Sequence, residues 1–401
     1  MQTSNVSRWV ADLSRLLWPL WALAALAAAP LLASPADFVA ASAAPSYRVL
    51  RLSTDRYAYG VDINARGQVA YTEHVGGVVR ARLYDGRSLH DLGTLGGPNA
   101  STRALNDSGQ VIGQSDVDRN GTLSHAYRWS PATGLVDLDA GSKTGSTVND
   151  INERGQIAGA GWTSVAGALQ YQAYFWNPQS GKVPVGSFGL SSTATALNNS
   201  GTVVGYAEGP GGGMNSILAF RWTRREGIRD IGTLPDEFTW ATDINDAGQI
   251  VGATPFAPGE QAHAFVWTPR QGLRNLGTGS GERSSATRIN NEGMVIGDTM
   301  SFEVPFFHGF VWTRGTGLIE FGADQPQTTT SASDVNRAGQ VVGSFGGRAL
   351  LWSRRHGVVD LNTRLAPAPR GLVLTNGVAI SDTGAIVAAS STGLYLLIPR
   401  R

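Results

Sequence analysis

The sequence predicts an all-β fold: a single β-propeller of eight four-stranded blades, with the ring closed by the N-terminal strand. Two motifs predict it, because a turn motif recurs every 42 to 47 residues and an aromatic motif follows each of its well-formed inner copies. A third observation is that the 51 glycines are spread along the chain, which indicates many tight turns between short strands. A seven-bladed ring is the alternative, if the shortened last unit packs irregularly.

The turn motif has the form apolar-Asn-x-x-Gly-x-apolar-apolar-Gly. Asparagine can cap a turn with its side chain, and glycine accepts the left-handed conformation that follows a type I turn, so the motif predicts a hairpin. The motif asparagines are Asn64, Asn106, Asn152, Asn198, Asn245, Asn290 and Asn336, and Ser381 takes this place in a degraded eighth copy.

The second motif is a short aromatic stretch that ends in tryptophan, as in His263 to Trp267. Its alternating pattern predicts a half-buried strand, and a Gly-apolar turn with a short last strand follows it. Four strands in about 45 residues is the size of one propeller blade. The repeated tryptophans, which we expect to pack between blades, are Trp129, Trp176, Trp222, Trp267, Trp312 and Trp352.

The two ends of the chain predict how the ring closes. Tyr47 to Leu52 resembles the last strand of a unit with nothing in front of it, and the final unit, Val378 to Ile398, lacks its last strand. If the first segment supplies the missing strand, the ring closes with eight blades and leaves no half-finished edge.

These motifs resemble the HAF-repeat family of bacterial extracellular proteins, which is named after a His-Ala-Phe triplet. His263 to Phe265 keeps the triplet, His125 to Tyr127 and His308 to Phe310 are near copies, and Leu92 to Gly97 carries a closing Leu-Gly-Thr-Leu-Gly-Gly motif. The resemblance covers about residues 47–398. It implies export and a repeat fold, and it implies no particular activity.

The N-terminus predicts export. Arg8 and Arg15 precede an uncharged apolar run from Leu16 to Ala33, and small residues follow, the order found in a secretory signal peptide. We assign residues 1–36 to this signal, with cleavage as late as residue 43, residues 37–46 to a linker and residues 47–401 to the propeller. An uncleaved membrane anchor is the alternative. The expected location is the medium, periplasm or cell surface of a bacterium, with no membrane span after cleavage.

Composition narrows the function. The net charge is +1, so the chain lacks the basic surface of a nucleic-acid-binding protein. It has no cysteine, which excludes disulfides, thiol nucleophiles and thiolate metal sites. It also contains no serine-hydrolase, zinc-protease, phosphate-loop or dinucleotide motif. We expect a monomer.

A ligand is expected on the loops between the second and third strands, because these loops vary while the turns repeat. The first of them runs from about Ala160 to Tyr171. Aromatic side chains there could stack on sugar rings or bury apolar ligand surface, or they could simply cover the blades against solvent. The candidate ligand-binding residues are Trp162, Tyr171, Trp240, Phe256, Phe302 and Phe306.

One segment could bind calcium. Asp116, Asp118 and Asn120 place oxygens at positions 1, 3 and 5 of a loop that has Gly121 at position 6. Position 12 is Tyr127, so the bidentate carboxylate of a full calcium loop is missing. An ordinary polar turn is the alternative, and no other cofactor is expected.

The sequence therefore favours an exported, non-enzymatic binding or scaffold protein for an envelope or extracellular ligand, either a polysaccharide or a protein. One alternative is a hydrolase or lyase that acts on glycans through loop carboxylates, with Glu208, Asp236, Glu237 and Glu260 as candidates. Another is a purely structural surface repeat protein.

Overall fold

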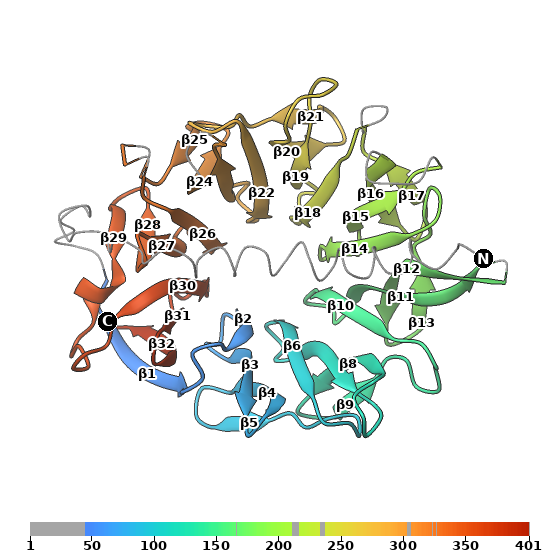
Figure 1. Cartoon of the computed structure of the whole chain (residues 1–401), viewed down its shortest axis with the longest axis horizontal. Coiled ribbons are helices and arrows are strands. Elements are labelled where there is room, and N and C mark those ends of the chain that lie inside the picture. The colour runs from blue at the N-terminus through green and yellow to red at the C-terminus, as the bar shows by residue number, and fades with distance from the viewer. Residues whose placement is uncertain are drawn as a thin grey trace.

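The computed structural model is a ring of eight four-stranded antiparallel sheets, an eight-bladed β-propeller (Figure 1). It describes residues 45–400 except 166, 211–215, 233–236, 303–305, 323 and 326, and the side chains of residues 165 and 168. The expected signal peptide lies outside the described residues, as does most of the expected linker. The predicted fold class and the predicted number of blades are confirmed.

Seven blades follow one another along the chain, each built from its innermost to its outermost strand. Blade 1 consists of β2 (Tyr59–Ile63), β3 (Val69–Val75), β4 (Val78–Tyr84) and β5 (Leu89–Asp91), and blade 2 of β6 (Ala100–Leu105), β7 (Val111–Asp116), β8 (Ser124–Ser130) and β9 (Gly134–Asp137). Blade 3 consists of β10 (Ser146–Ile151), β11 (Ile157–Val165), β12 (Ala168–Asn177) and β13 (Gly181–Pro184), and blade 4 of β14 (Ser192–Leu197), β15 (Val203–Glu208), β16 (Ile217–Thr223) and β17 (Gly227–Asp230). Blade 5 consists of β18 (Trp240–Ile244), β19 (Ile250–Thr254), β20 (His263–Thr268) and β21 (Gly272–Asn275), and blade 6 of β22 (Arg283–Ile289), β23 (Val295–Met300), β24 (Phe307–Thr313) and β25 (Gly317–Glu320). Blade 7 consists of β26 (Thr330–Val335), β27 (Val341–Phe345), β28 (Arg348–Ser353) and β29 (Gly357–Asp360). The 3₁₀ helix η4 (Leu361–Arg364) follows β29.

Blade 8 joins the two ends of the chain. It consists of β30 (Leu374–Ile380), β31 (Ile386–Ser390) and β32 (Gly393–Pro399), with β1 (Tyr47–Ser53) as its outermost strand. Strand β1 pairs antiparallel with β32, from Tyr47 opposite Pro399 to Ser53 opposite Leu394. The predicted closure by the N-terminal strand is confirmed.

The repeated asparagines hold the first turn of blades 1 to 7 and also link neighbouring blades. The Oδ1 atom of Asn198 accepts hydrogen bonds from the backbone N–H groups of Ser200 and Thr202, which fixes the turn. Its Nδ2 atom donates to the carbonyl oxygen of Asn245 in the next blade, at 3.1 Å. The same donation runs from blade 1 to blade 8, through Asn64, Asn106, Asn152, Asn198, Asn245, Asn290 and Asn336 to the carbonyl of Ser381. We call this series the asparagine ring.

The apolar core lies between blades. In one cluster Val204 and Ala219 of blade 4 pack against Ile250, Phe265 and Trp267 of blade 5, all of them buried. Equivalent clusters fill the other interfaces, so each repeated tryptophan packs against the preceding blade, as its period predicts.

Strand direction gives the ring two different faces. The turns between first and second strands, which carry the asparagine ring, lie on one face with the turns between third and fourth strands; we call this the turn face. The connections between second and third strands lie on the opposite face with the linkers between blades; we call this the loop face.

Candidate functional site

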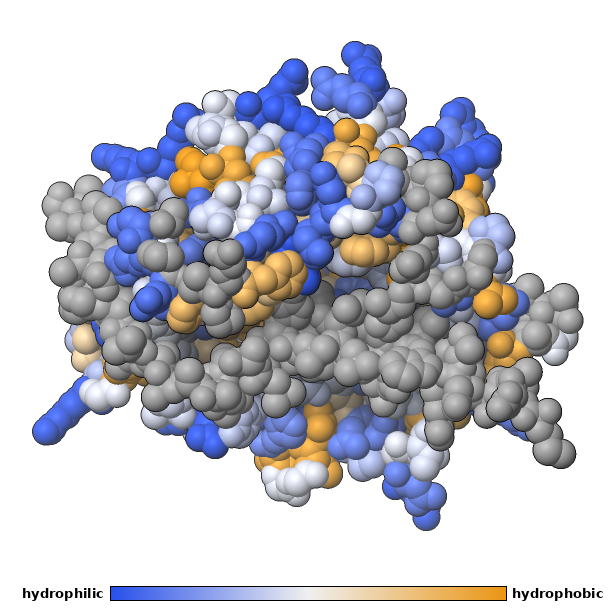
Figure 2. All heavy atoms as spheres, turned by 45° about the horizontal axis from the view of Figure 1, so that its top comes forward, coloured by the Kyte–Doolittle hydropathy of each residue, from blue (hydrophilic) through white to orange (hydrophobic). Residues whose placement is uncertain are grey.

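Exposed apolar side chains gather on the loop face. Nine large apolar side chains are exposed in the described part of the chain, and two of them, Leu89 and Ile319, lie on the outermost strands β5 and β25. The other seven lie on the loop face: Tyr57, Tyr59, Val75, Leu169, Leu190, Phe302 and Val373. In the view of Figure 2 apolar residues form separate clusters between hydrophilic ones. The seven are spread around the ring, in blades 1, 3 and 6 and in three linkers, so the loop face carries most of the exposed large apolar side chains of the described residues without forming one continuous patch.

The hairpin of β11 and β12 carries the first pair of candidate residues. Trp162 lies directly opposite Tyr171 across the two strands, with ring centroids 5.4 Å apart and planes at 67°. The Tyr171 hydroxyl is 3.0 Å from Oγ1 of Thr147 on β10, and the ring of Tyr171 is buried. The expectation that Ala160 to Tyr171 is an irregular loop is wrong, because both strands continue beyond the end of β10 and hold Trp162 in a regular ladder.

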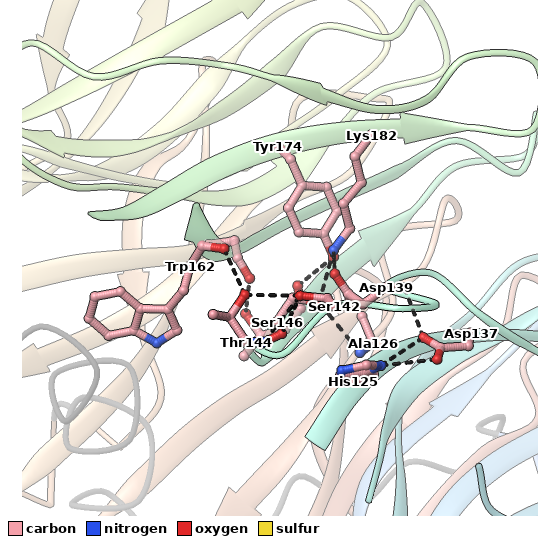
Figure 3. Close-up of polar contacts among 12 residues, drawn as sticks. His125, Ala126, Asp137, Asp139, Ser142, Thr144, Ser146, Trp162, Tyr174 and Lys182 are labelled. Atoms are coloured by element: carbon pink, nitrogen blue, oxygen red, sulfur yellow. Dashed lines mark hydrogen bonds and ion pairs between the residues drawn. The ribbon is translucent and has the colours of Figure 1, made fainter. Parts of the chain in front are cut away.

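Polar contacts from the linker between β9 and β10 hold the β11–β12 hairpin in place (Figure 3). Oγ1 of Thr144 donates to the carbonyl oxygen of Trp162 at 3.1 Å, and the N–H of Trp162 donates to the carbonyl of Gly145 at 3.3 Å. Ser142 supports Thr144 through a hydroxyl contact of 3.0 Å. In Figure 3 the half-buried indole ring of Trp162 points away from these contacts.

Blade 5 holds the second group of aromatic candidates. Trp240, the half-buried first residue of β18, stacks on Phe238 with centroids 4.9 Å apart and planes at 8°. Phe256 packs half-buried against the core between blades 4 and 5, and its ring lies 6.1 Å from that of His263. Part of this aromatic surface therefore has a packing role.

The remaining candidates belong to blade 6. Phe302 is 56% exposed between β23 and β24, whereas Phe306 is half-buried just before β24. All six aromatic candidates thus lie on or beside the loop face, in blades 3, 5 and 6. Of these six, only Trp162 and Tyr171 form a ring pair with one another among the contacts of the described residues.

The candidate calcium loop is hydrogen-bonded internally. The carboxylate of Asp116 accepts from Nδ2 of Asn99 at 2.8 Å and from the hydroxyl of Ser124 at 2.6 Å. Asp118 accepts from the N–H groups of Asn120 and Thr122 and from the Thr122 hydroxyl, and these hydrogen bonds lower its pKa. Within the described ranges no group of three or more His, Cys, Asp or Glu side chains could hold a metal ion. Calcium binding at Asp116, Asp118 and Asn120 stays a prediction.

A half-buried ion pair between blades 2 and 3 was missed by the sequence reasoning. Lys182 contacts Asp139 and also lies 3.0 Å from the hydroxyl of Ser146, as Figure 3 shows. Burial lowers the pKa of Lys182 against the opposite effect of Asp139. The signal lay in the repeat itself. Asp139 stands where five other blades have glycine, and Lys182 stands where other last strands have an apolar residue.

The serine in this group has a structural role. Ser146 accepts a hydrogen bond from the N–H of Ala126 in the preceding blade. Ser192 and Ser284 occupy the same repeat position and accept the same bond from Ala173 and Ala264. A serine beside a lysine can mark a nucleophile, but a bond repeated in several blades marks an interblade link.

Carboxylates line the central channel in every second blade. Asp62, Asp150, Asp243 and Asp334 belong to the innermost strands of blades 1, 3, 5 and 7. Each accepts a hydrogen bond of 2.8 to 2.9 Å from a backbone N–H of the following blade's innermost strand. The equivalent residues of blades 2, 4, 6 and 8 are Ala104, Ala196, Arg288 and Ala379.

Burial raises the pKa of these carboxyl groups, to about 6 for Asp62 and to about 7 for Asp150. Arg288 opposes this effect, and its own pKa is raised, mainly by Asp334, whose Oδ1 lies 3.6 Å from Nε of Arg288. At the turn-face mouth a polar cavity of about 290 Å³ is lined by the asparagine turns of blades 3 to 6 and by Arg337 and Asp382.

The carboxylates considered for glycan hydrolysis lie on the loop face, with Glu208 in blade 4 and with Glu237 and Glu260 in neighbouring segments beside blade 5. Glu237 accepts the N–H of Gly259 at 2.7 Å, which ties a linker to the β19–β20 connection. Burial raises the pKa of Glu208 at the end of β15. Asp236 lies outside the described residues, and no contact in the described part of the chain joins Glu208, Glu237 and Glu260 to one another.

No protein-family model matches the chain, and no curated protein matches it. Solved structures do match. Oligopeptidase B from Leishmania major is 9% identical with a TM-score of 0.51, covering 78% of this chain and 49% of that protein. Acylaminoacyl peptidase from Pyrococcus horikoshii is 11% identical with a TM-score of 0.51, covering 77% of this chain and 54% of that one. Streptogramin B lyase is 12% identical with a TM-score of 0.44, covering 88% and 98%.

This chain spans about half the length of the two peptidases. At these identities the likeness shows the shared propeller fold alone. No helix among the described residues is long and apolar enough to cross a membrane.

Proposed function

We propose that the protein is an exported, non-enzymatic binding protein that holds an envelope or extracellular ligand, a polysaccharide or a protein, on its loop face. The observation that carries the proposal is the difference between the two faces. Seven exposed large apolar side chains lie on the loop face, and the turn face consists of repeated polar turns. The basic, apolar and small-residue order of residues 1–36 and the resemblance to HAF-repeat proteins support export.

Two double variants test the binding face. Trp162→Ala with Phe302→Ala changes the loop face, and Arg270→Ala with Arg314→Ala removes two exposed charges from turns of the opposite face. The purified protein is assayed by surface plasmon resonance against a panel of bacterial envelope polysaccharides and secreted bacterial proteins. Saturable binding that the first variant loses and the second keeps supports the proposal. Binding lost only in the second variant, or chemical turnover of the bound ligand, overturns it.

Export has its own test. Full-length protein expressed in a Gram-negative host should appear in the periplasm or medium, and its N-terminal sequence should begin between residues 37 and 44. Recovery of protein that begins at residue 1 and stays in the membrane fraction would establish a retained anchor instead.

A further inference from the structure

We infer that the β11–β12 hairpin binds a neutral glycan, with the indole ring of Trp162 as the surface on which a sugar ring stacks. The inference rests on the proposed function and names the ligand class of one part of the loop face. Three features of the hairpin carry it: the separation of its side chains between two sides, its lack of charge and its rigidity.

The two sides of the hairpin differ in chemistry. Residues that lie opposite one another across two strands point to the same side, and alternate residues share a side. Trp162, Tyr171 and Leu169 therefore lie on one side, and Leu169 is 57% exposed. The other side carries Gln170 and Thr163, which pair directly. On the Trp162 side, Ser164 lies opposite Leu169 and adds a hydroxyl group. A flat ring beside a hydroxyl group matches a sugar, which has apolar C–H faces and a rim of hydroxyl groups.

The hairpin and its flanks carry no charge. Residues 155–181 contain no Asp, Glu, Lys or Arg, although at the chain's average of 16% charged residues a segment of this length would hold about four. Asp139 and Lys182 beside it neutralise one another. Lys143, on the adjoining linker, is exposed and is the charged neighbour that an anionic ligand would use. The absence of charge across the hairpin favours a neutral ligand.

The platform is held in place before any ligand arrives. The edge contact with Tyr171 orients the indole, Thr147 holds the Tyr171 hydroxyl, and Thr144 holds the backbone of Trp162. A ring that is already ordered loses little conformational entropy on binding, so weak stacking contacts suffice for measurable affinity.

The test is isothermal titration of the purified full-length protein with neutral glucan, mannan and galactan oligosaccharides and with acidic polygalacturonate oligosaccharides. Trp162→Ala should weaken binding of the neutral oligosaccharide at least tenfold, and Trp162→Phe should weaken it less. Lys143→Ala and the turn-face control, Arg270→Ala with Arg314→Ala, should leave it unchanged. Circular dichroism and thermal unfolding establish that each variant is folded.

Three results would overturn the glycan assignment: no neutral oligosaccharide binds, binding survives Trp162→Ala, or acidic oligosaccharides are preferred and lose affinity in Lys143→Ala. Binding of a secreted bacterial protein alone, lost in the loop-face double variant, would overturn the ligand class and leave the proposed function standing. Ligand binding of any kind that the loop-face double variant keeps, and the turn-face variant loses, would overturn both.

Discussion

The turn face and the loop face are built on the same eight blades, yet the repeat constrains them differently. On the turn face one asparagine in each of blades 1 to 7 serves both its own turn and the next blade, so its replacement disturbs two blades at once. On the loop face the connections between second and third strands range from the tight β3–β4 turn to the long segment between Thr254 and His263, and most of their side chains make no contact that recurs in other blades. Stability thus depends mainly on the turn face, and the loop face is free to vary with the ligand.

The largest effect should come from the asparagine ring. Asn245→Ala removes an acceptor for the N–H of Gln249 and a donor to the carbonyl of Asn290, and the Asn245 side chain is buried. We expect a loss of about 3 kcal/mol in the free energy of unfolding, measured with guanidinium. Phe302→Ala on the loop face should change it by no more than about 0.5 kcal/mol. Equal losses in the two variants would contradict the proposed division between the faces.

Asp139 and Lys182 both differ from the residues that most other blades have at these positions. The pair tests whether one of these changes offsets the effect of the other on stability. Lys182→Leu should cost about 2 kcal/mol, because it leaves the half-buried carboxylate of Asp139 without its cation. Adding Asp139→Gly restores the glycine and the apolar residue that other blades have, and should recover most of the loss. A double-mutant cycle with no coupling energy would show that the two changes are independent.

The channel carboxylates predict a smaller effect that depends on pH. Their pKa values are raised in the folded protein, so between about pH 4 and pH 7 the folded state holds protons that the unfolded chain has released. Stability should therefore fall as pH rises through this window. We expect the Tm at pH 5 to exceed that at pH 8 by about 2 °C. Asp150→Asn should make the Tm depend less on pH. If the Tm of this variant changes with pH as in the unaltered protein, groups other than Asp150 cause the pH dependence.

The smallest effect is expected from calcium. Because Asn99, Ser124 and Thr122 already donate to Asp116 and Asp118, about 1 mM calcium should raise the Tm by less than about 1 °C. A shift of several degrees that Asp116→Asn abolishes would establish a calcium site on the loop face.

The features predictable from the sequence are those that repeat. The turn asparagines and the tryptophans recur at a fixed spacing, so they predict eight blades, and the unpaired Tyr47 to Leu52 predicts the closing strand. The interblade donation by Asn198 could not be predicted in the same way, because it depends on which residues become neighbours in the ring. The strand character of Ala160 to Tyr171 was missed because its small and polar residues lack a clear alternation.

The alternation of channel residues bears on how such a protein can be re-engineered. A carboxylate links blade 1 to 2, 3 to 4, 5 to 6 and 7 to 8, and an alanine or an arginine occupies the position at the other four junctions. If the protein gained or lost a single blade, two carboxylate-bearing blades would become neighbours, or a carboxylate would lose the blade whose backbone N–H it accepts. Gain or loss of two blades would keep every link. Recombinant rings of other sizes should therefore be assembled from pairs of blades.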